Sequence, residues 1–337
     1  MGLKVAMITP WKKKCGIYTY SRDLVDALAE EDVDVYVVPL PRFGSKTGEI
    51  MAGIANQVPF EDVDVIHVQH EHGLYVNLEQ QFYGTLKQFG KPIISTMHAV
   101  GNFHVDPTVV NNSDLVVVHN EFCRFQLKHP CKIIPHGCKS IAPTNKEEAK
   151  KAMGLNPEDS IVGYVGFISE YKGLETLISA MAKVPTAGLL IGGGWHTGPS
   201  TIYINQLKKY SQNLLPHRHQ WIGFVPEEQM ATVYGAMDIV VYPSIFSTES
   251  GALLMALGHG KAVIARELTP FKEKEKMGAL RTFTDENNLV MNIKRLLRNE
   301  AGRGYLEEGA RIYCEINSWK NVAKMHIEAY EGVLNHT

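Results

Sequence analysis

Short apolar runs alternate with helix-like segments along most of this chain of 337 residues. The clearest example lies between Asp238 and Ala265. An apolar run, 238–242, ends at Pro243, a polar loop leads into the helix-like run 252–257, and a second apolar run, 262–265, follows. Strand, loop, helix and strand in this order form a βαβ unit, whose two strands lie parallel in one sheet. The repeated alternation therefore predicts an α/β fold.

The same pattern recurs on both sides of a change in composition near residue 145. We predict further strands at 5–9, 34–38, 63–68, 92–97, 115–118, 133–134, 161–165, 188–191 and 220–224. We predict helices at 17–30, 49–57, 78–89, 146–153, 174–181, 202–214, 226–234, 285–298 and 319–334. Residues 140–159 are rich in Pro, Thr, Asn, Lys and Glu, which is typical of a linker. The chain thus reads as two α/β halves of similar size.

Composition excludes several classes of protein. Hydrophobic residues make up 45% of the chain, enough for large cores, and the net charge of -2 gives no bulk attraction to nucleic acid. No apolar run approaches the roughly 20 residues of a membrane span, and we see no signal-peptide pattern at the N-terminus. The five cysteines match no zinc or pairing motif, so we expect free thiols, no bound metal and a cytoplasmic location.

Two loops that follow predicted strands could meet a phosphate. Ligands of doubly wound sheets bind at the carboxyl ends of the strands, where helix N-termini favour anions. Gly16 ends the loop that starts at Pro10, and its backbone could approach a phosphate or a sugar; the alternative is an ordinary turn with solvated lysines. Lys172 precedes Gly173 at a helix start, where its ammonium could contact a diphosphate or simply be solvated.

The loop of residues 243–251 carries the most polar groups. Ser250 and Gly251 stand where the next helix begins, so we expect this loop to touch a ligand. Glu249 is its one carboxylate. It could cap the helix, or it could hold sugar hydroxyls or support developing positive charge. The glycines at 192–194 fail the GxGxxG dinucleotide pattern, and we place them in a loop near the ligand.

Several histidines follow predicted strands. His67, His70 and His72 resemble metal ligands, but in a strand His67 points away from the other two. We therefore favour polar residues at a strand end over a metal site. His98, directly after the strand 92–97, could donate to a hydroxyl or phosphate, or be a structural histidine. His136 has a similar position.

Taken together, these motifs resemble the retaining, GT-B-fold glycosyltransferases of the family-4 type. The N-terminal half is similar to that family in residues 10–20 (P-x4-C-G-I-x2-Y), 64–74, 96–98 and 134–137. The C-terminal half is similar in residues 166–173, 223–226, 238–244 and 250–264. The order and spacing of these segments, rather than any one of them, carry the resemblance, and it extends over nearly the whole chain.

The resemblance implies two Rossmann-like domains that face a central cleft. The acceptor domain would be 1–143 with the C-terminal helix 319–337 packed on it, and the nucleotide-sugar donor domain 144–318. It assigns Lys172, His98 and Glu249 to catalysis, and Gly16 and Lys172 to the donor diphosphate. It places Ser250, Gly251, Ala252 and Leu253 at the donor, and Cys15, His136, Gly137, Gly193 and Val225 near the cleft.

The expected reaction moves a sugar from a nucleotide-diphosphate donor to a hydroxyl acceptor, which could be a glycan, a lipid or a small molecule. The resemblance implies no metal and no cofactor, because lysine and helix N-termini would neutralise the leaving diphosphate. We expect no nucleic-acid partner and at most peripheral membrane contact.

Two departures from the family pattern favour an alternative. Phe167 stands where the family has an arginine, and Met255 where it has a ribose-binding glutamate. In strict register the family's first glutamate falls on Ser247. A non-catalytic nucleotide-sugar binder or partner subunit is therefore the second hypothesis. An epimerase of the same architecture lacks an evident acid and base pattern, and a dehydrogenase lacks the GxGxxG turn.

Overall fold

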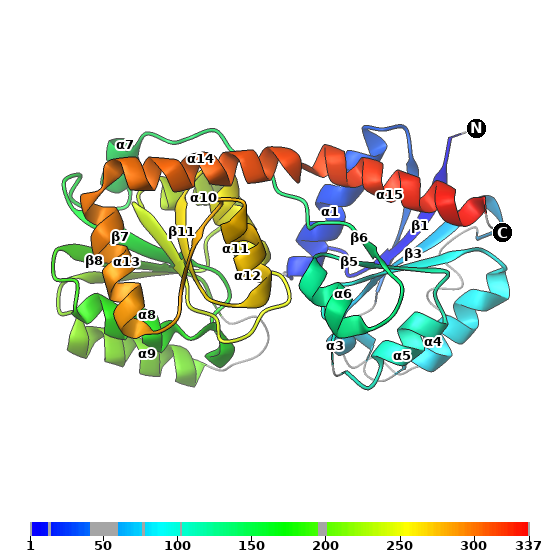
Figure 1. Ribbon diagram of the computed structural model, residues 1–337, viewed down its shortest axis with the longest axis horizontal. Coiled ribbons are helices and arrows are strands. Elements are labelled where there is room, and N and C mark those ends of the chain that lie inside the picture. The colour runs from blue at the N-terminus through cyan, green and yellow to red at the C-terminus, as the bar shows by residue number, and fades with distance from the viewer. Residues whose placement is uncertain are drawn as a thin grey trace. The chain divides into compact units, whose positions relative to one another are not determined.

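The computed structural model describes residues 2–12, 15–40, 60–75, 78–101, 103–194 and 201–335 (Figure 1). The chain divides into two compact units, Met1–Gly137 with Asn317–Thr337, and Cys138–Ile316. The division after residue 137 differs from the expected boundary at 143. Cys138 is bonded to Cys314, and the Ile141 N–H donates to the Gly258 carbonyl, so this stretch belongs to the second unit.

The first unit is built on a six-stranded parallel sheet in the order β2-β1-β3-β4-β5-β6. Its elements are β1 (Lys4–Thr9), α1 (Gly16–Ala29), β2 (Asp34–Pro39), η1 (Phe60–Asp62), β3 (Val65–His70), α3 (His72–Tyr75), α4 (Glu79–Leu86), η2 (Lys87–Phe89), β4 (Ile93–Met97), α5 (Asp106–Asn111), β5 (Leu115–Val118), α6 (Glu121–Leu127), β6 (Lys132–Ile133) and α15 (Trp319–Leu334). Strands β3 and β4 are buried along their whole length, including the polar side chains of β3, because helices cover both faces of a parallel sheet.

Helix α15 completes the core of this unit, although it lies at the other end of the chain. It packs beside α1, as its position in Figure 1 also shows. Val322, Ala323, Ala329 and Tyr330 of α15 are buried in one cluster with residues of β1 and α1. These positions recur at helical spacing, so the apolar face of α15 is turned toward the sheet.

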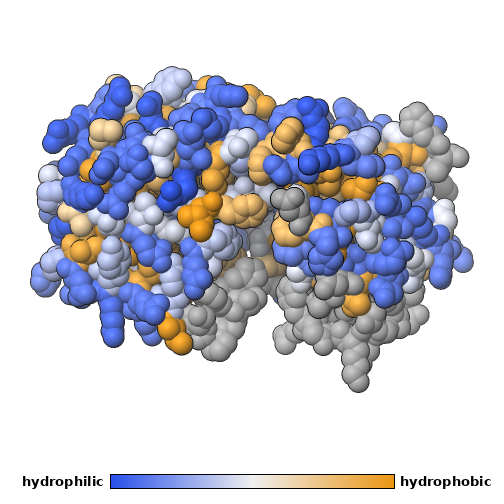
Figure 2. Space-filling model, turned by 60° about the horizontal axis from the view of Figure 1, so that its bottom comes forward, coloured by the Kyte–Doolittle hydropathy of each residue, from blue (hydrophilic) through white to orange (hydrophobic). Residues whose placement is uncertain are grey.

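The second unit contains a second six-stranded parallel sheet, in the order β12-β11-β10-β7-β8-β9. Its elements are α7 (Lys146–Ala152), β7 (Ser160–Val165), η3 (Glu170–Lys172), α8 (Leu174–Ala182), β8 (Ala187–Gly192), α9 (Thr201–Leu214), β9 (His219–Gly223), α10 (Glu227–Gly235), β10 (Ile239–Tyr242), α11 (Gly251–Gly258), β11 (Ala262–Arg266), α12 (Thr269–Lys276), β12 (Arg281–Phe283), α13 (Glu286–Arg298) and α14 (Glu300–Ile316). Hydrophobic side chains are also exposed on the surface. On the face shown in Figure 2 they form separate patches.

Strand order determines where each sheet can hold a ligand. In the second unit the chain runs from β7 outward through β8 and β9, then returns to β10 on the other side of β7. The carboxyl ends of β7 and β10 therefore lie at the switch point of the sheet, the usual ligand position in open α/β sheets. In the first unit the corresponding switch lies between β1 and β3.

The structure confirms the two Rossmann-like sheets, and the predicted strands and helices that it describes are present with ends shifted by one or two residues. The predicted helix 49–57 lies outside the described residues. Sequence reasoning missed α3, α5, α6, α12, β12 and α14. Most of these are short, and the Lys/Glu-rich α12 shows little apolar periodicity.

The expectation of free thiols was wrong for two of the five cysteines. Cys138 and Cys314 form a disulfide across a sequence separation of 176 residues, while Cys15, Cys123 and Cys131 are free. No local spacing motif can reveal a pair so far apart, because the fold alone brings the two residues together. Among the described helices, none is both long and apolar enough to cross a membrane.

Candidate functional site

The N-terminus of α11 opens at the carboxyl end of β10, beside the switch point of the second sheet. The Ser250 hydroxyl accepts a hydrogen bond from the Leu253 N–H at 3.3 Å, and the Ser250 carbonyl accepts one from the Leu254 N–H. The N–H groups of Gly251 and Ala252 have no partner among the described residues. Two open donors at the positive end of a helix are suited to bind an anion.

Of the four residues predicted to bind the donor here, Leu253 does not offer an open group. Its N–H is taken by the Ser250 cap, and its side chain is fully buried in the core. Ser250 acts as the cap itself, which leaves Gly251 and Ala252 as the residues with free N–H groups.

The loop after β7 lies against this helix start. A Cβ atom added at Gly166 would stand 3.3 Å from the Ala252 Cβ, so the two backbones approach closely. Tyr242 joins them: its hydroxyl donates to the Ala252 carbonyl at 2.6 Å and lies 3.1 Å from the Val165 carbonyl. Tyr242 is buried, and this bond holds the first turn of α11 over the end of β7.

Lys172 ends the 3-10 turn η3 that follows the β7 loop. It is half-buried, its ammonium lies 4.7 Å from the centre of the Tyr171 ring, and no carboxylate in the described part of the chain pairs with it. Gly173 has a φ of +65°, and a Cβ there would lie 2.6 Å from the Pro243 carbonyl oxygen. Because residue 173 is glycine, the turn η3 that carries Lys172 can pack directly against the loop after β10.

The loop after β8 packs under the same region. Gly193 has a φ of +143°, and an added Cβ would collide with the Gly166 carbonyl oxygen. Its N–H donates to the Gly223 carbonyl at 2.6 Å. Gly193 therefore joins three loops at this edge of the sheet. Val225, predicted to line the cleft, is instead a buried core side chain that packs beside Gly192.

Glu249 is turned into the protein. One carboxylate oxygen accepts the Ser250 N–H at 2.8 Å, and the other accepts the Lys274 ammonium at 2.8 Å. The Glu249 side chain is 6% exposed and the Lys274 side chain 3% exposed. These contacts favour a structural role for Glu249 over a direct contact with a sugar. Sequence reasoning missed Lys274 because it lies in a run of charged residues that reads as solvated surface.

In the first unit, Cys15 is a capping residue. Its sulfur accepts the Tyr18 N–H at 3.3 Å and so caps α1, which starts at Gly16 after β1. Gly16 is exposed, and nothing lies within 4 Å of a Cβ built on it. A side chain at 16 would therefore meet none of the residues that the structure describes.

His98 has a polar partner near each ring nitrogen. Nε2 lies 2.9 Å from the Gln69 amide oxygen, and Nδ1 lies 3.1 Å from His119 Nε2. His119 Nδ1 in turn lies 3.2 Å from the Ile134 carbonyl. Because a carbonyl only accepts, His119 donates to it from Nδ1. A neutral His98 carries one ring proton, so it can donate to the Gln69 amide oxygen or to His119, but not to both. Burial, together with His119 and His136, lowers the pKa of His98 well below its usual value.

The other two predicted residues of this unit, His136 and Gly137, contact neighbouring parts of the same unit. His136 Nδ1 lies 2.7 Å from the Gly137 carbonyl, and its ring contacts Tyr20. A Cβ at Gly137 would overlap the Trp319 ring, so glycine at 137 admits α15 rather than a ligand.

The three histidines near the end of β3 diverge. His67 contacts Tyr330 and Thr96, His70 contacts Glu79, and His72 contacts Glu71. In the described residues, no three His, Cys, Asp or Glu side chains are grouped so that they could hold a metal ion.

Known proteins match this chain in sequence and in fold. Residues 145–313 match the family model described as "Glycosyl transferases group 1". A D-inositol 3-phosphate glycosyltransferase of Mycobacterium ulcerans (strain Agy99) is 24% identical over 240 residues, which cover 68% of this chain and 51% of the relative. The lipopolysaccharide core biosynthesis mannosyltransferase LpsB of Rhizobium meliloti (strain 1021) is 26% identical over 215 residues, 60% of this chain and 58% of the relative. The chain spans about half the length of most of these curated relatives.

Solved structures show the same fold. Sucrose-phosphate synthase from Thermosynechococcus elongatus superposes with a TM-score of 0.78 at 18% identity, over 99% of this chain and 100% of that one. Anabaena Alr3699/HepE in complex with UDP-glucose gives a TM-score of 0.80 at 17% identity, over 98% and 100%. The folds are those of GT-B proteins, and the family match covers half of this chain. The chain belongs to the group 1 glycosyl transferase family.

Proposed function

We propose that this protein transfers a sugar from a nucleotide-diphosphate sugar to a hydroxyl acceptor, with retention of the anomeric configuration. The observation that carries the proposal is the open N-terminus of α11 at the switch point of the second sheet, with the turn that carries Lys172 packed against the loop before this helix. Its two free N–H groups and one ammonium suit a diphosphate. The structure of the similar HepE protein is described as a complex with UDP-glucose, which supports this choice of donor.

The proposed reaction needs charge stabilisation more than covalent catalysis. The bond between the anomeric carbon and the diphosphate oxygen breaks, and an oxocarbenium-like state develops on the sugar. The acceptor oxygen attacks the same face, and its proton passes to the leaving phosphate oxygen. Lys172 and the N–H groups of Gly251 and Ala252 stabilise the leaving diphosphate, whose negative charge grows as the bond breaks.

We also propose roles for the first unit. His98 positions the transferred sugar, and the first unit binds the acceptor. We also propose that no metal is required, because the cationic groups named above supply the counter-charge. Turnover that survives chelation with EDTA supports this part, and turnover restored only by added Mg²⁺ or Mn²⁺ contradicts it.

A donor panel tests the proposed activity. The purified protein is incubated with UDP-, GDP- and ADP-sugars, with and without crude acceptor extracts, and free nucleotide and labelled products are separated by chromatography. We expect hydrolysis or transfer with at least one donor, and a product linkage of the same anomeric configuration as the donor. No turnover of any donor under any of these conditions contradicts the proposed activity.

A non-catalytic nucleotide-sugar binder is the second candidate, favoured by two side chains. Phe167 and Met255 replace the arginine and glutamate that the family resemblance implies, and Met255 packs against the apolar core. Losing a guanidinium and a ribose carboxylate could each weaken donor binding by about 1–3 kcal/mol. Calorimetry separates the candidates: donor binding without turnover favours the binder, and binding with turnover favours the enzyme.

A further inference from the structure

A buried ion pair lies directly behind the candidate anion site. Glu249 is the residue before the Ser250 cap, and Lys274 lies in the last turn of α12. The two side chains meet at 2.8 Å, and each is less than one-tenth exposed. The second carboxylate oxygen of Glu249 holds the Ser250 N–H. A single carboxylate thus connects the first residues of the α11 N-terminus to α12.

Lys274 is fixed in its charged form. Burial disfavours its charge, but the Glu249 carboxylate and the nearby Tyr313 outweigh burial and raise the pKa of Lys274 above its usual value. The ammonium also lies 5.7 Å from the centre of the Tyr313 ring, which belongs to α14. The loop before α11 is thereby tied to two helices of the second unit that carry no predicted site residue.

The charge of this pair matters for an anionic ligand. A carboxylate one residue before a helix cap occupies the positive end of that helix and repels a phosphate that approaches the same N–H groups. An adjacent ammonium cancels this repulsion while the carboxylate still holds the backbone. With Lys274 in place, the loop gains a fixed backbone without adding net negative charge beside Gly251 and Ala252.

We propose that Lys274 is a positioning residue of the donor site, which acts through Glu249 to hold the loop before α11 and to cancel the carboxylate charge facing an incoming diphosphate. This inference rests on the proposed function, because it assumes an anionic donor at α11. It assigns Glu249 to the support of the site and not to the sugar, so neither side chain touches the reacting atoms.

A double-mutant cycle tests the pair. Lys274→Met leaves Glu249 buried and uncompensated, and should raise the Kd for UDP at least about ten-fold, since removing one partner strands the other charge. Adding Glu249→Gln removes that charge, keeps an acceptor for the Ser250 N–H, and should recover most of the lost affinity. The same cycle with UDP-glucose tests a contact with the sugar: if Glu249→Gln weakens binding of UDP-glucose but not of UDP, Glu249 contacts the sugar and the inference is overturned.

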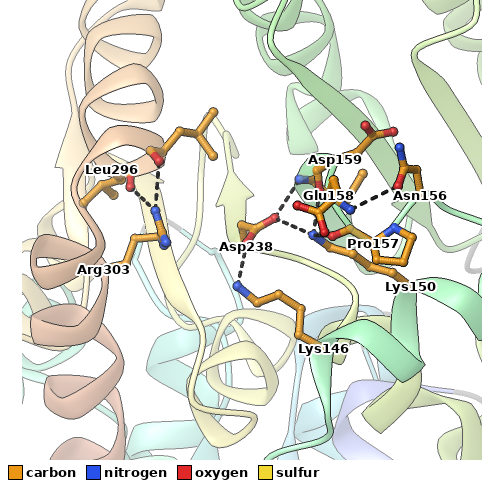
Figure 3. A network of polar contacts seen from close by, with 11 residues as sticks. Lys146, Lys150, Asn156, Pro157, Glu158, Asp159, Asp238, Leu296 and Arg303 are labelled. Carbon is orange, nitrogen blue, oxygen red and sulfur yellow. Dashed lines mark hydrogen bonds and ion pairs between the residues drawn. The ribbon is translucent and has the colours of Figure 1, made fainter.

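Hydrogen–deuterium exchange gives a readout that does not depend on a ligand. Lys274→Met should speed exchange in the peptide that covers residues 243–254, and the double variant should slow it again. Lys150→Met is the matched control. Lys150 is 4% exposed in its side chain and pairs with Asp238 at the opposite, amino end of the same sheet, as Figure 3 shows. This control should leave the Kd for UDP within about two-fold of the wild type and the exchange of 243–254 unchanged.

The outcomes separate this inference from the proposed function. If the wild type binds no nucleotide sugar, the proposed function fails, and the exchange data alone decide whether Lys274 holds the loop. If the wild type binds UDP but Lys274→Met binds it equally well, or the double variant binds no better than Lys274→Met, the inference is overturned. Should Lys274→Met fail to fold, Lys274→Gln, which keeps a hydrogen-bond donor but no charge, takes its place in the same cycle.

Discussion

Gly173→Ala tests whether the close approach of two loops builds the site. Gly173 has a φ of +65°, and its Cα faces the Pro243 carbonyl. The Pro243 oxygen cannot retreat easily, because Arg266 Nε donates to it at 3.0 Å. Gly154 is the matched control: its φ is +70°, but nothing lies within 4 Å of a Cβ built there.

Both substitutions strain the backbone, but only Gly173→Ala also creates a steric overlap. An L-residue in the left-handed region costs about 1–2 kcal/mol, and this applies to both glycines. At Gly173 the added methyl would stand 2.6 Å from a backbone oxygen, closer than real Cβ atoms come. Overpacking of this kind costs about 1–3 kcal/mol more. We therefore expect Gly173→Ala to lower the free energy of unfolding by about 2–5 kcal/mol, and Gly154→Ala by about 1–2 kcal/mol.

The assay is urea unfolding of the whole chain for all three proteins, with calorimetric titration of UDP as the second measurement. Gly173→Ala should also weaken UDP binding, since the new methyl pushes the Lys172 turn away from the loop after β10, whereas Gly154→Ala should not. Equal destabilisation by the two variants would refute the close approach, and unchanged UDP binding by Gly173→Ala would refute its importance to the site.

Three further predictions concern other parts of the chain. Lys172→Met should raise the Kd for UDP by about 10–150-fold, the value of a charge-assisted hydrogen bond, while Lys151→Met on the exposed surface of α7 should not; equal affinities would contradict the role of Lys172. Thiol titration of the unreduced, denatured chain should find three free thiols, and Cys314→Ser should lower the free energy of unfolding by about 2–5 kcal/mol; five free thiols would contradict the bridge. Burial lowers the pKa of His67 to about 3 from the usual 6.5, so the unfolded chain binds a proton that the folded chain does not, and stability should fall as the pH drops from 6.5 toward 3. His67→Asn should flatten this part of the stability profile, and an unchanged profile would contradict the assignment.

The sequence was sufficient to predict both sheets because the apolar runs are long and the breaks after them are strong. Pro243 directly follows β10, and Gly258 is the last residue of α11, so both breaks predicted the observed ends. The short helices α5 and α6 could not be predicted in the same way, since six or seven residues give too little periodicity.

The candidate site was predictable in outline only. Gly251 and Lys172 follow from local rules about helix starts and glycine turns. The partners of Glu249 and His98 do not, because Lys274 is 25 residues away from Glu249 and His119 is 21 residues from His98. A carboxylate or an imidazole looks equally available in a sequence whether it faces a ligand or a buried partner. Burial and pairing decide between these roles, and both arise from the tertiary fold.

The open N–H groups of α11 are proposed to hold the donor diphosphate. Gly251→Pro tests this proposal directly, because proline suits the first position of a helix, tolerates the extended Ser250 before it, and removes one N–H. Glu286→Pro makes the same change at the first position of α13, after the extended cap Asp285. In calorimetric titrations with UDP-glucose, the wild type and Glu286→Pro should bind alike, and Gly251→Pro should bind roughly ten-fold or more weakly. Equal binding by Gly251→Pro and the wild type, or no binding by the wild type, would contradict the claim.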